Sequence, residues 1–351
     1  MINIEMRVTE FTEAMHPAWD TFVENSIVGL PQHLSGWRTV LARTHGYETH
    51  YLMARQGETI VGVLPLFIVR SLLLGDSATT MPGGLCADSD EAALALVKRG
   101  QEIARRAGAG RFLLHDSRRP WSAGLQTSSS HEHWVVDVRM GVDALWQSLD
   151  GNIRRQVRIA RRQGLRVEID RSGRLLGPFY QVLCRFTHQI GTPVFGRDFL
   201  EHVVETFPGG FNIAVVYKGR APIGGYFQLQ LGRRVYGTWG ASLREYLELR
   251  PVYLAYWEIL HNAVENGYDF LDMGRSPAGS NASKFKGQWG GYCQPVYQQV
   301  AALGNSRAAK SPTSRVESDG RFQLIQWLWP KLPLPLTQYL GPKLRRHMPF
   351  G

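Results

Sequence analysis

The order of predicted elements repeats along this chain, and the repeat constrains the fold more than any other feature of the sequence. Each copy has two strands joined by a tight glycine turn, then a helix, then a buried strand. In the first copy these elements are expected at residues 49–56, 58–69, 91–107 and 110–118. In the second copy they are expected at residues 211–219, 221–232, 253–266 and 268–276, with one further strand at 233–242 before the helix. The repeat predicts a duplicated α/β protein.

The ends of the two copies also align without gaps. The stretch "AGAGRFLLHDSR" lies over "VENGYDFLDMGR", and Arg118 falls on Arg275. A chain of 351 residues has about the length of two domains of roughly 150 residues with extra segments. We therefore predict domains at 1–140 and 141–305, followed by a linker and a C-terminal tail at 306–351.

The composition predicts a folded protein with an anionic partner. Hydrophobic residues make up 44% of the chain, which is enough for packed cores, and the formal net charge is +10. That charge suits nucleic acid, a phosphate-bearing substrate or an acidic membrane face, without choosing among them. The cysteines Cys86, Cys184 and Cys293 lie far apart, so neither a disulfide framework nor a metal site is expected.

The sequence shows neither a secretory signal nor a stretch of about 18 apolar residues that could span a bilayer. It predicts a cytoplasmic protein, with the inner face of the membrane as a further location. The tail that begins at Phe322 alternates Trp, Leu, Pro and basic residues after a Ser- and Arg-rich linker at 304–321. Such a tail either packs back on the body of the protein or makes a peripheral contact with lipid headgroups.

Five arginines cover most of one predicted helix between the two copies. Ile153, Val157 and Ala160 form its apolar stripe, and the remaining positions carry Arg154, Arg155, Arg158, Arg161 and Arg162. One interpretation is a solvated helix face. The other is an anion-binding surface, because arginines without acidic neighbours repel one another until a counter-charge arrives.

The segment 271–291, "LDMGRSPAGSNASKFKGQWGG", follows a predicted buried strand, yet it is rich in Gly and Ser and carries three basic residues. We interpret it as a loop whose backbone approaches a phosphorylated ligand and whose lysine faces a reacting carbonyl. Arg275 stands at the end of the strand, where open α/β sheets usually bind ligands. The alternative for Arg275 is a structural salt bridge.

Four blocks of sequence resemble one known family. They are "RRQVRIARRQGLRVEI", "GTPVFGRDFLEHVVETF", "GASLREYLELRPVYLAYWEIL" and "GYDFLDMGRSPAGSNASKFKGQWGG". In this order they resemble the FemAB-type branch of the GNAT acyltransferase superfamily, in particular the relatives associated with exosortase and exopolysaccharide systems. The resemblance is strong over 143–300. It implies an α/β (α+β) fold of two tandem GNAT-like domains, each a mixed, mainly antiparallel sheet flanked by helices.

The resemblance also implies a catalytic pair. The family's Phe-Lys motif matches Phe285 and Lys286, and an ammonium beside an ester or thioester can stabilise the oxyanion that forms when an amine attacks. For Lys286 the alternative is an exposed lysine in a flexible loop. Arg275, Ser276, Ser283 and the weaker candidate Lys284 are expected to bind substrate.

Further substrate-binding residues are expected outside this segment. Arg197 ends the loop "GTPVFGR", which resembles the acceptor side of the family's site, and Tyr226 and Trp239 lie on successive predicted strands. Each of the two aromatic residues could equally belong to the core. Asp272 is the nearest carboxylate that could accept a proton, although a nucleophilic amine can lose its proton to substrate or water instead.

The implied function is transfer of an acyl or aminoacyl group to an amine of a cell-envelope precursor, either peptidoglycan or a surface polysaccharide. No cofactor is expected to be tightly bound, and the donor is acyl-CoA or aminoacyl-tRNA. The chain departs from the founding members of the family because it lacks their long helical arm, which puts tRNA as donor in doubt. Two alternatives stay open: an acyl-CoA-dependent N-acetyltransferase of another amine, and a non-catalytic scaffold for RNA or membrane.

Overall fold

The structure is a computed structural model, and it describes residues 5–71, 75–303 and 320–348. The predicted linker at 304–321 lies almost entirely outside the described residues. The chain forms two compact units. Unit 1 comprises residues 1–130, 296–325 and 342–351, and unit 2 comprises residues 131–295 and 326–341.

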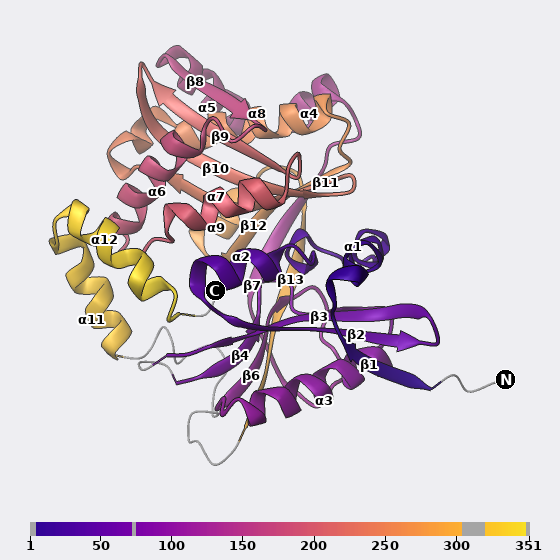
Figure 1. Ribbon diagram of the computed structural model, residues 1–351. Helices are drawn as coiled ribbons and strands as arrows, with labels where there is room; N and C mark the ends of the chain where they lie inside the picture. Colours follow the sequence, from indigo (N-terminus) through magenta and orange to yellow (C-terminus); the bar gives the residue numbers. More distant parts are fainter. Residues whose placement is uncertain (1–4, 72–74, 304–319, 349–351) are drawn as a thin grey trace. The chain divides into compact units, whose positions relative to one another are not determined.

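The first strand in the sheet of unit 1 lies near the start of the chain, and the last strand comes from a segment far along the chain (Figure 1). Its strands are β1 (Met6–Glu10), β2 (Glu48–Gln56), β3 (Thr59–Val69), β4 (Ser77–Thr80), β5 (Cys86–Ala87), β6 (Arg111–Ser117) and the second half of β13 (Tyr292–Ala302). Its helices are η1 (Glu13–Met15), α1 (His16–Asn25), η2 (Pro31–His33), α2 (Trp37–His45) and α3 (Asp90–Arg106).

Unit 2 contains most of the second half of the chain. Its strands are β8 (Leu165–Asp170), β9 (Phe211–Lys218), β10 (Ala221–Leu231), β11 (Arg234–Ser242), β12 (Phe270–Pro277) and the second half of β7 (Gln126–Asp137). Its helices are α4 (Val142–Ser148), α5 (Gly151–Arg162), α6 (Leu176–Gln189), α7 (Arg197–Thr206), η3 (Arg244–Leu249), α8 (Pro251–Glu265) and α9 (Asn281–Gly287). The tail forms α11 (Gly320–Leu328), η5 (Trp329–Lys331) and α12 (Leu334–Arg345), of which residues 326–341 belong to unit 2 and the rest to unit 1.

The two units have the same sheet topology, which confirms the predicted duplication. The strand order is β1-β2-β3-β4-β6-β13 in unit 1 and β8-β9-β10-β11-β12-β7 in unit 2. In each sheet every neighbouring pair is antiparallel except one, the pair β4–β6 or β11–β12. In unit 1 the helix α3 precedes β6 of the parallel pair, and in unit 2 the helix α8 precedes β12. The expected fold class, with mixed and mainly antiparallel sheets flanked by helices, is confirmed.

The domain limits differ from the contiguous domains 1–140 and 141–305 that we expected. The second half of β7 pairs with β12 and so belongs to unit 2, although it precedes residue 140. The second half of β13 pairs with β6 and so belongs to unit 1, although it lies before residue 305. Each sheet thus takes its last strand from the other segment of the chain. The sequence carries no local sign of this exchange, because the partners lie far apart along the chain.

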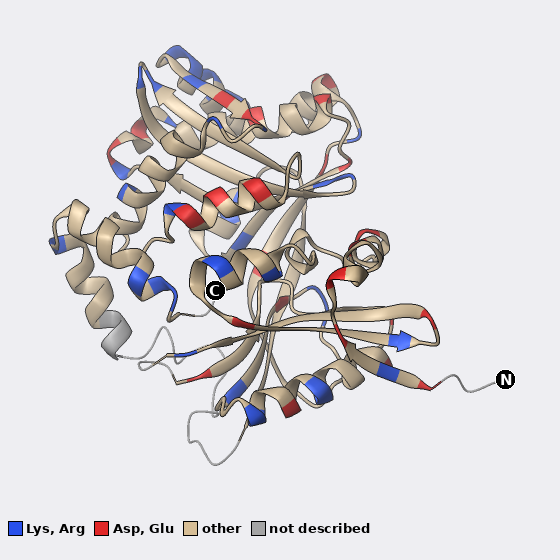
Figure 2. Ribbon diagram, in the orientation of Figure 1, with Lys and Arg blue, Asp and Glu red and all other residues tan. Residues whose placement is uncertain are grey.

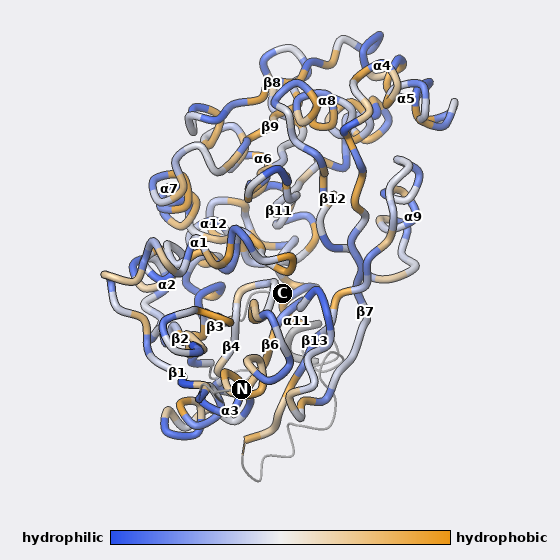
Figure 3. The backbone as a smooth tube through the Cα atoms, turned by 90° about the vertical axis from the view of Figure 1, so that its right-hand side faces the viewer, coloured by the Kyte–Doolittle hydropathy of each residue, from blue (hydrophilic) through white to orange (hydrophobic). Residues whose placement is uncertain are grey.

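Alternation of side chains along the strands decides which helix covers which face of each sheet. In unit 1, Leu52 and Ala54 face the core under α3, while Tyr51 stacks on Trp19 of α1 with ring centroids 5.2 Å apart. In unit 2, Phe227 packs on Phe179 of α6, while its neighbour Tyr226 packs on the α8 side. Figure 3 shows polar and apolar stretches alternating along α7, of which Phe199, Leu200 and Val203 are buried.

Helix boundaries follow from local chemistry, as the sequence predicts. The Ser89 side chain accepts a hydrogen bond from the Ala92 amide at the start of α3, and Gly108 follows that helix with φ of 71°. Gly267 follows α8 with the same φ of 71°. Among the described residues no helix is long and apolar enough to cross a membrane.

Candidate functional site

The site in unit 2 is built where two parallel strands separate. β11 and β12 pair only from Arg234–Phe270 to Tyr236–Asp272. Beyond that point β12 bulges against β7, and Gly274 adopts φ of 79°. A Cβ atom at Gly274 would lie 2.5 Å from the backbone oxygen of Gly237. Only glycine fits this left-handed position against the neighbouring strand.

The backbone of Gly274 binds two functional groups, the Asp272 carboxylate and the Lys286 ammonium. Its N–H donates to Asp272 Oδ1 at 2.8 Å, and its carbonyl accepts from Lys286 Nζ at 2.8 Å. Lys286 Nζ also donates to the carbonyl of Arg275 at 3.1 Å. The bulge therefore turns two carbonyl groups toward one ammonium group.

The second half of the Gly- and Ser-rich segment is a helix, which corrects our prediction of a loop over the whole of 271–291. Ser280 caps α9 by accepting a hydrogen bond from the Ser283 amide at 3.2 Å. A Cβ at Gly287 would lie 2.9 Å from the ring of Trp134, so the glycine lets the helix pack against β7. Helical packing leaves Lys286 only 8% exposed, and the alternative of an exposed loop lysine is wrong.

Burial changes the acid–base properties of Lys286. Loss of solvent around the ammonium lowers its pKa from 10.5 to about 8; the Asp272 carboxylate opposes this change and the Arg275 guanidinium adds to it. An ammonium has three N–H donors, two of which bind the carbonyl groups of Gly274 and Arg275. The third has no hydrogen-bond acceptor among the described residues.

Asp272 binds a histidine that the sequence did not single out as a site residue. His133 Nδ1 lies 2.7 Å from Asp272 Oδ1, and the side chains are 12% and 5% exposed. A carboxylate in this position fixes the orientation of the imidazole ring. We interpreted "HEHW" at 131–134 only as the start of a strand. The alternation of β7, which puts His131 and His133 on one face, was the available signal.

The predicted serines lie close to Lys286 in the sequence and occupy different surroundings. Ser283 Oγ donates to the carboxylate of Glu132 and accepts from Trp134 Nε1 at 2.8 Å. The hydrogen bond from Ser283 lowers the pKa of the Glu132 carboxyl group. Ser276 is 2% exposed, and its Oγ has no hydrogen-bond partner among the described residues. Lys284 is exposed.

The structure does not bring Arg197, Tyr226 and Trp239 together. Trp239 faces α7, where its ring contacts Phe199 at 5.7 Å, on the opposite face of the sheet from Tyr226. Tyr226 is 9% exposed and its hydroxyl group lies 2.9 Å from Ser242 Oγ. Arg197 begins α7 and forms an ion pair with Glu201 at 2.8 Å. Their predicted role in binding substrate stays a prediction.

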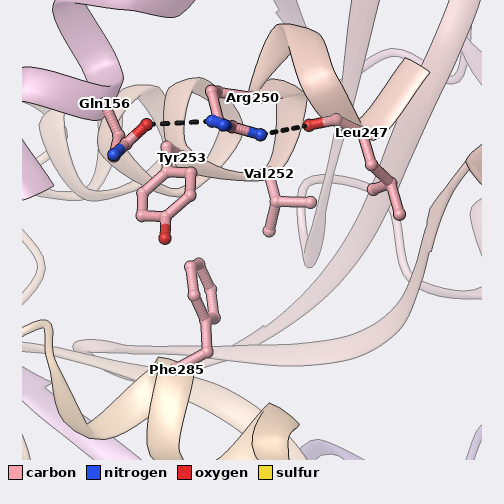
Figure 4. A pocket seen from close by; sticks show the side chains of 6 residues that line it. All are labelled: Gln156, Leu247, Arg250, Val252, Tyr253 and Phe285. Atoms are coloured by element: carbon pink, nitrogen blue, oxygen red, sulfur yellow. Dashed lines mark hydrogen bonds between the residues drawn. The ribbon is translucent and has the colours of Figure 1, made fainter.

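A pocket of about 350 Å³ opens at the start of α8 (Figure 4). Its lining consists of Gln156, Leu247, Arg250, Val252, Tyr253 and Phe285. Figure 4 shows Phe285 pointing up from α9 toward Tyr253, while Arg250 closes the opposite side. The lining is mostly apolar with one cation and one amide, which is typical of small-molecule sites.

Arg250 combines three features that suit an anionic ligand. Its Nε donates to Gln156 Oε1 at 2.9 Å, which holds the guanidinium at the pocket. Its φ of 65° directs the chain from η3 into α8, which begins at Pro251. The first amide groups of a helix lack partners within the helix and attract anions. Sequence reasoning missed Gln156 and Arg250, because they lie 94 residues apart.

An aromatic cluster separates the pocket from the buried core. Phe285 contacts Tyr253 at 5.1 Å, Tyr256 at 5.6 Å and Trp289 at 6.1 Å between ring centroids. Trp289 is fully buried, in line with a packing role. Phe285 and Lys286 are adjacent on α9, so one short helix contributes both an apolar wall of the pocket and the buried ammonium.

The arginine-rich helix α5 partly neutralises its charge within unit 2. Its predicted stripe, Ile153, Val157 and Ala160, is buried. Arg161 forms an ion pair with Glu258 at 2.8 Å, and Arg158 lies over the Trp146 ring at 5.6 Å. The charge distribution is visible as blue segments in Figure 2. α5 also contributes Gln156 to the pocket, while none of its arginines lines it.

The comparisons with known proteins agree with this geometry. A family model described as an acetyltransferase (GNAT) domain matches residues 147–287, which include α5, the pocket and Lys286. This part of the chain is therefore similar to a GNAT domain. No curated protein sequence matches the chain at a significant level.

Solved structures extend the likeness to both units. FemX has a TM-score of 0.66 at 16% identity, with 91% of this chain and 100% of that chain covered. A tandem GNAT protein from the clavulanic acid biosynthesis pathway has a TM-score of 0.57 at 12% identity, with 86% and 100% covered. The C-terminal domain of a protein assigned as a lysylphosphatidylglycerol synthetase, from Agrobacterium fabrum, has a TM-score of 0.56 at 15% identity, with 82% and 91% covered.

At these identities the likenesses show the fold alone, and together with the domain match they agree with the predicted resemblance to the FemAB-type branch of the GNAT superfamily. Among the described residues there is no group of three His, Cys, Asp or Glu side chains that could hold a metal ion.

We expect Gly274→Ala to destabilise the protein more than Gly279→Ala. Both residues have positive φ, 79° and 70°, but a Cβ at Gly279 meets nothing within 4 Å. Gly279→Ala should therefore cost about 1 kcal/mol from backbone strain alone. Gly274→Ala adds the clash with Gly237 and should cost at least about twice as much. Urea unfolding of both variants measures the difference, and equal costs would contradict the close approach of the two strands.

We also expect the stability difference between the wild type and Lys286→Met to depend on pH. Lys286 releases its proton near pH 8 in the folded protein and near 10.5 in the unfolded chain. Below pH 8 the Lys286 side chain is charged in both the folded and the unfolded state, and the folded state bears the full free-energy cost of burying the ammonium. This cost is relieved as pH rises from 8 to 10.5, so the wild type should gain about 3 kcal/mol relative to Lys286→Met.

Urea unfolding at several pH values between 7.5 and 10.5 tests this expectation, with the exposed neighbour Lys284→Met as the matched control. The Lys284→Met difference should stay flat over this range. A flat difference for Lys286→Met as well would show that its ammonium is not desolvated.

Proposed function

We propose that this protein is an N-acyltransferase that moves an acyl or aminoacyl group from a phosphate-bearing donor to an amine of a cell-envelope precursor. The observation that carries the proposal is the buried Lys286 ammonium, held by the carbonyl groups of Gly274 and Arg275 with one donor left over. It lies on the helix that also forms a wall of the pocket, inside the GNAT domain.

The pocket is the proposed donor site. A phosphate or pyrophosphate group would lie at the start of α8, where Arg250 supplies charge and the amide groups that follow Pro251, which has no N–H itself, supply donors. The apolar part of the donor would extend along Leu247, Val252 and Phe285. This division of polar and apolar contacts suits the phosphopantetheine of acyl-CoA. The phosphate that joins the terminal adenosine to the rest of an aminoacyl-tRNA is the same kind of anionic group.

Transfer would proceed by direct attack of the amine on the donor carbonyl. The nitrogen forms a bond to the carbonyl carbon while the carbonyl oxygen takes on negative charge, which the third N–H of Lys286 stabilises. The attacking nitrogen loses one proton, the oxyanion reforms the carbonyl, and the bond to the sulfur or ribose oxygen breaks; this leaving group takes up the proton that the nitrogen lost, directly or through water. Asp272 already accepts hydrogen bonds from His133 and Gly274, so in this proposal it positions these groups rather than acting as the base.

The choice of an envelope amine rests on likeness to other proteins. The FemAB resemblance implies peptidoglycan precursors, and the name of one structural neighbour refers to lysylphosphatidylglycerol synthesis. The acceptor is therefore proposed as a class: an amine of a peptidoglycan intermediate or an amino sugar of a surface polysaccharide. A second candidate, an acyl-CoA-dependent N-acetyltransferase of another amine, is favoured by the shortness of α5, which has 12 residues where the founding members carry a long arm.

A transfer assay with mass-spectrometric detection tests the function. Purified protein is incubated with acetyl-CoA or with aminoacyl-tRNA, and with peptidoglycan precursors, amino sugars or a simple polyamine as acceptor. Envelope amines should be acylated and the polyamine should not; the reverse would favour the second candidate. Lys286→Ala should lose at least roughly a hundredfold in kcat, the effect of removing one oxyanion donor.

The pH dependence of transfer separates catalysis by the Lys286 ammonium from a purely structural role. Activity of the wild type should fall as pH rises above about 8, because the ammonium loses its proton. In Lys286→Arg this decline should move upward, because a guanidinium does not titrate there. If Lys286→Ala keeps full activity, the reacting carbonyl lies elsewhere in the protein. The scaffold alternative gains support if the wild type transfers no group with any donor and acceptor.

Arg250→Ala tests the donor pocket separately from the chemistry. Loss of a charged hydrogen bond to phosphate should raise KM for the donor roughly tenfold or more while kcat changes less. Arg244→Ala, an exposed arginine at the start of η3, is the matched control and should leave KM unchanged. Equal KM values for the two variants would show that the donor does not bind in this pocket.

A further inference from the structure

A histidine and a carboxylate are bonded to each other next to the Lys286 ammonium. His133 Nδ1 lies 2.7 Å from Asp272 Oδ1, and the same oxygen accepts the Gly274 N–H at 2.8 Å. The Gly274 carbonyl in turn accepts from Lys286 Nζ at 2.8 Å. One glycine residue therefore links the pair of imidazole and carboxylate to the ammonium that the proposed function places at the reacting carbonyl.

The bulge in β12 brings these groups to one place. Between Asp272 and Arg275, β12 has one residue more than β7 has on the opposite side. After the bulge His133 lies opposite Arg275, whose carbonyl is the second acceptor of Lys286 Nζ at 3.1 Å. The strand pairing thus places the His133 backbone beside one of the two carbonyl groups that hold the ammonium.

The hydrogen bond to Asp272 decides which nitrogen of the His133 ring can take up a proton. A carboxylate only accepts, so in the neutral imidazole the proton lies on Nδ1 and Nε2 carries a lone pair. The Asp272 side chain is 5% exposed, which shields this hydrogen bond from water, and the His133 side chain is 12% exposed. The carboxylate fixes the ring orientation and stabilises the imidazolium that forms when Nε2 takes up a proton.

The other polar groups of the site are poor acceptors for the proton that the attacking nitrogen loses. Lys286 has to keep its ammonium form to stabilise the oxyanion, and the Arg275 guanidinium does not titrate in the relevant range. Burial raises the pKa of Tyr256, so its hydroxyl group keeps its own proton. A carboxyl group such as that of Asp272 is ordinarily a weaker base than an imidazole. Of these groups, only the imidazole ordinarily titrates between pH 5 and 8.

We propose that His133 is the general base of the transfer, an inference that rests on the proposed function. Its Nε2 takes one proton from the acceptor amine as the nitrogen bonds to the donor carbonyl carbon, and the ring becomes an imidazolium paired with the Asp272 carboxylate. As the carbonyl reforms and the bond to the sulfur or ribose oxygen breaks, the imidazolium gives this proton to the leaving group, directly or through water. The amine therefore approaches on the β7 side of the reacting carbonyl, and the oxyanion lies on the α9 side.

His133→Asn tests this role in the transfer assay. The asparagine amide keeps an N–H donor for Asp272 and has no counterpart of the nitrogen Nε2. Loss of a general base should lower kcat at least roughly a hundredfold, while KM for the donor changes less than in Arg250→Ala. The matched control is His261→Asn, which replaces a histidine of α8 that lies 3.3 Å from the Glu265 carboxylate, and it should keep the wild-type kcat.

The pH profile separates a base from a residue that only supports the structure. It is measured as kcat at saturating acceptor, so that it reports groups of the bound complex. Wild-type activity should fall below about pH 6.5 as the imidazole is protonated, besides its fall above about pH 8 when Lys286 loses its proton. In His133→Asn the remaining activity should lose the acid limb and keep the alkaline one. His131→Asn, which removes the other imidazole on this face of β7, should keep both limbs.

Chemical labelling tests whether Nε2 of His133 is accessible without any transfer reaction. Diethyl pyrocarbonate ethoxycarbonylates the unprotonated nitrogen of an accessible imidazole, and mass spectrometry of the peptides locates the label. At about pH 7 the reagent should label His133 and the partly exposed His261, and it should not label His33, which is 1% exposed. Wild-type activity should be lost in step with the labelling of His133.

Four results would overturn the role of His133 and leave the proposed function in place. They are a wild-type kcat in His133→Asn, an acid limb that this variant keeps or that His131→Asn loses, a His133 that stays unlabelled while His261 reacts, and full activity after His133 is labelled. Thermal unfolding shows whether His133→Asn is folded, and if it is not, the labelling of the wild type decides. A wild type that transfers no group with any donor and acceptor would contradict the proposed function itself.

Discussion

The close approach of Gly237 and Gly274 is the constraint on which the candidate site depends. Because no side chain fits between the backbones of β11 and β12, the two parallel strands touch at that point and then follow separate paths. The positive φ of Gly274 turns its carbonyl toward α9 and its amide toward Asp272. A larger residue at either glycine would move the acceptors that hold Lys286.

The buried ammonium shows how the structure accepts a local cost at a functional position. Desolvation lowers the pKa of Lys286 because the charged form loses its hydration, and two carbonyl groups only partly compensate. A hydrophobic side chain would avoid that cost. An ammonium that is poorly solvated by the protein interacts strongly with negative charge that develops nearby, because the local dielectric is low.

Local and repeated features were predictable from the sequence. The duplicated order of elements, the helix-ending glycines Gly108 and Gly267 and the buried stripe of α5 all follow from periodicity and turn chemistry. The helix α9 was missed because its seven residues are too few to show a period, and because the glycines around it favour a loop. Its cap, Ser280, was the only local signal.

Pairings across long stretches of chain could not be predicted. His133 meets Asp272 across 139 residues, and Gln156 meets Arg250 across 94. Nothing local in "HEHW" or "LELRP" indicates such partners, because strand register and helix packing create them. The family resemblance selected Lys286 and Phe285, and the structure adds the pocket and the residues that hold Lys286 in place.

The exchange of β7 and β13 has a consequence for how this chain is made. Phe112 pairs with Ala301, so the first sheet lacks its last strand until β13 has left the ribosome. Leu271 pairs with Val136, so β7 has no partner in the second sheet until β12 has been synthesised. The first sheet is therefore completed only after all strands of the second sheet have been made. A nascent chain stalled before β13 exposes the unpaired edge of β6 to chaperones and proteases.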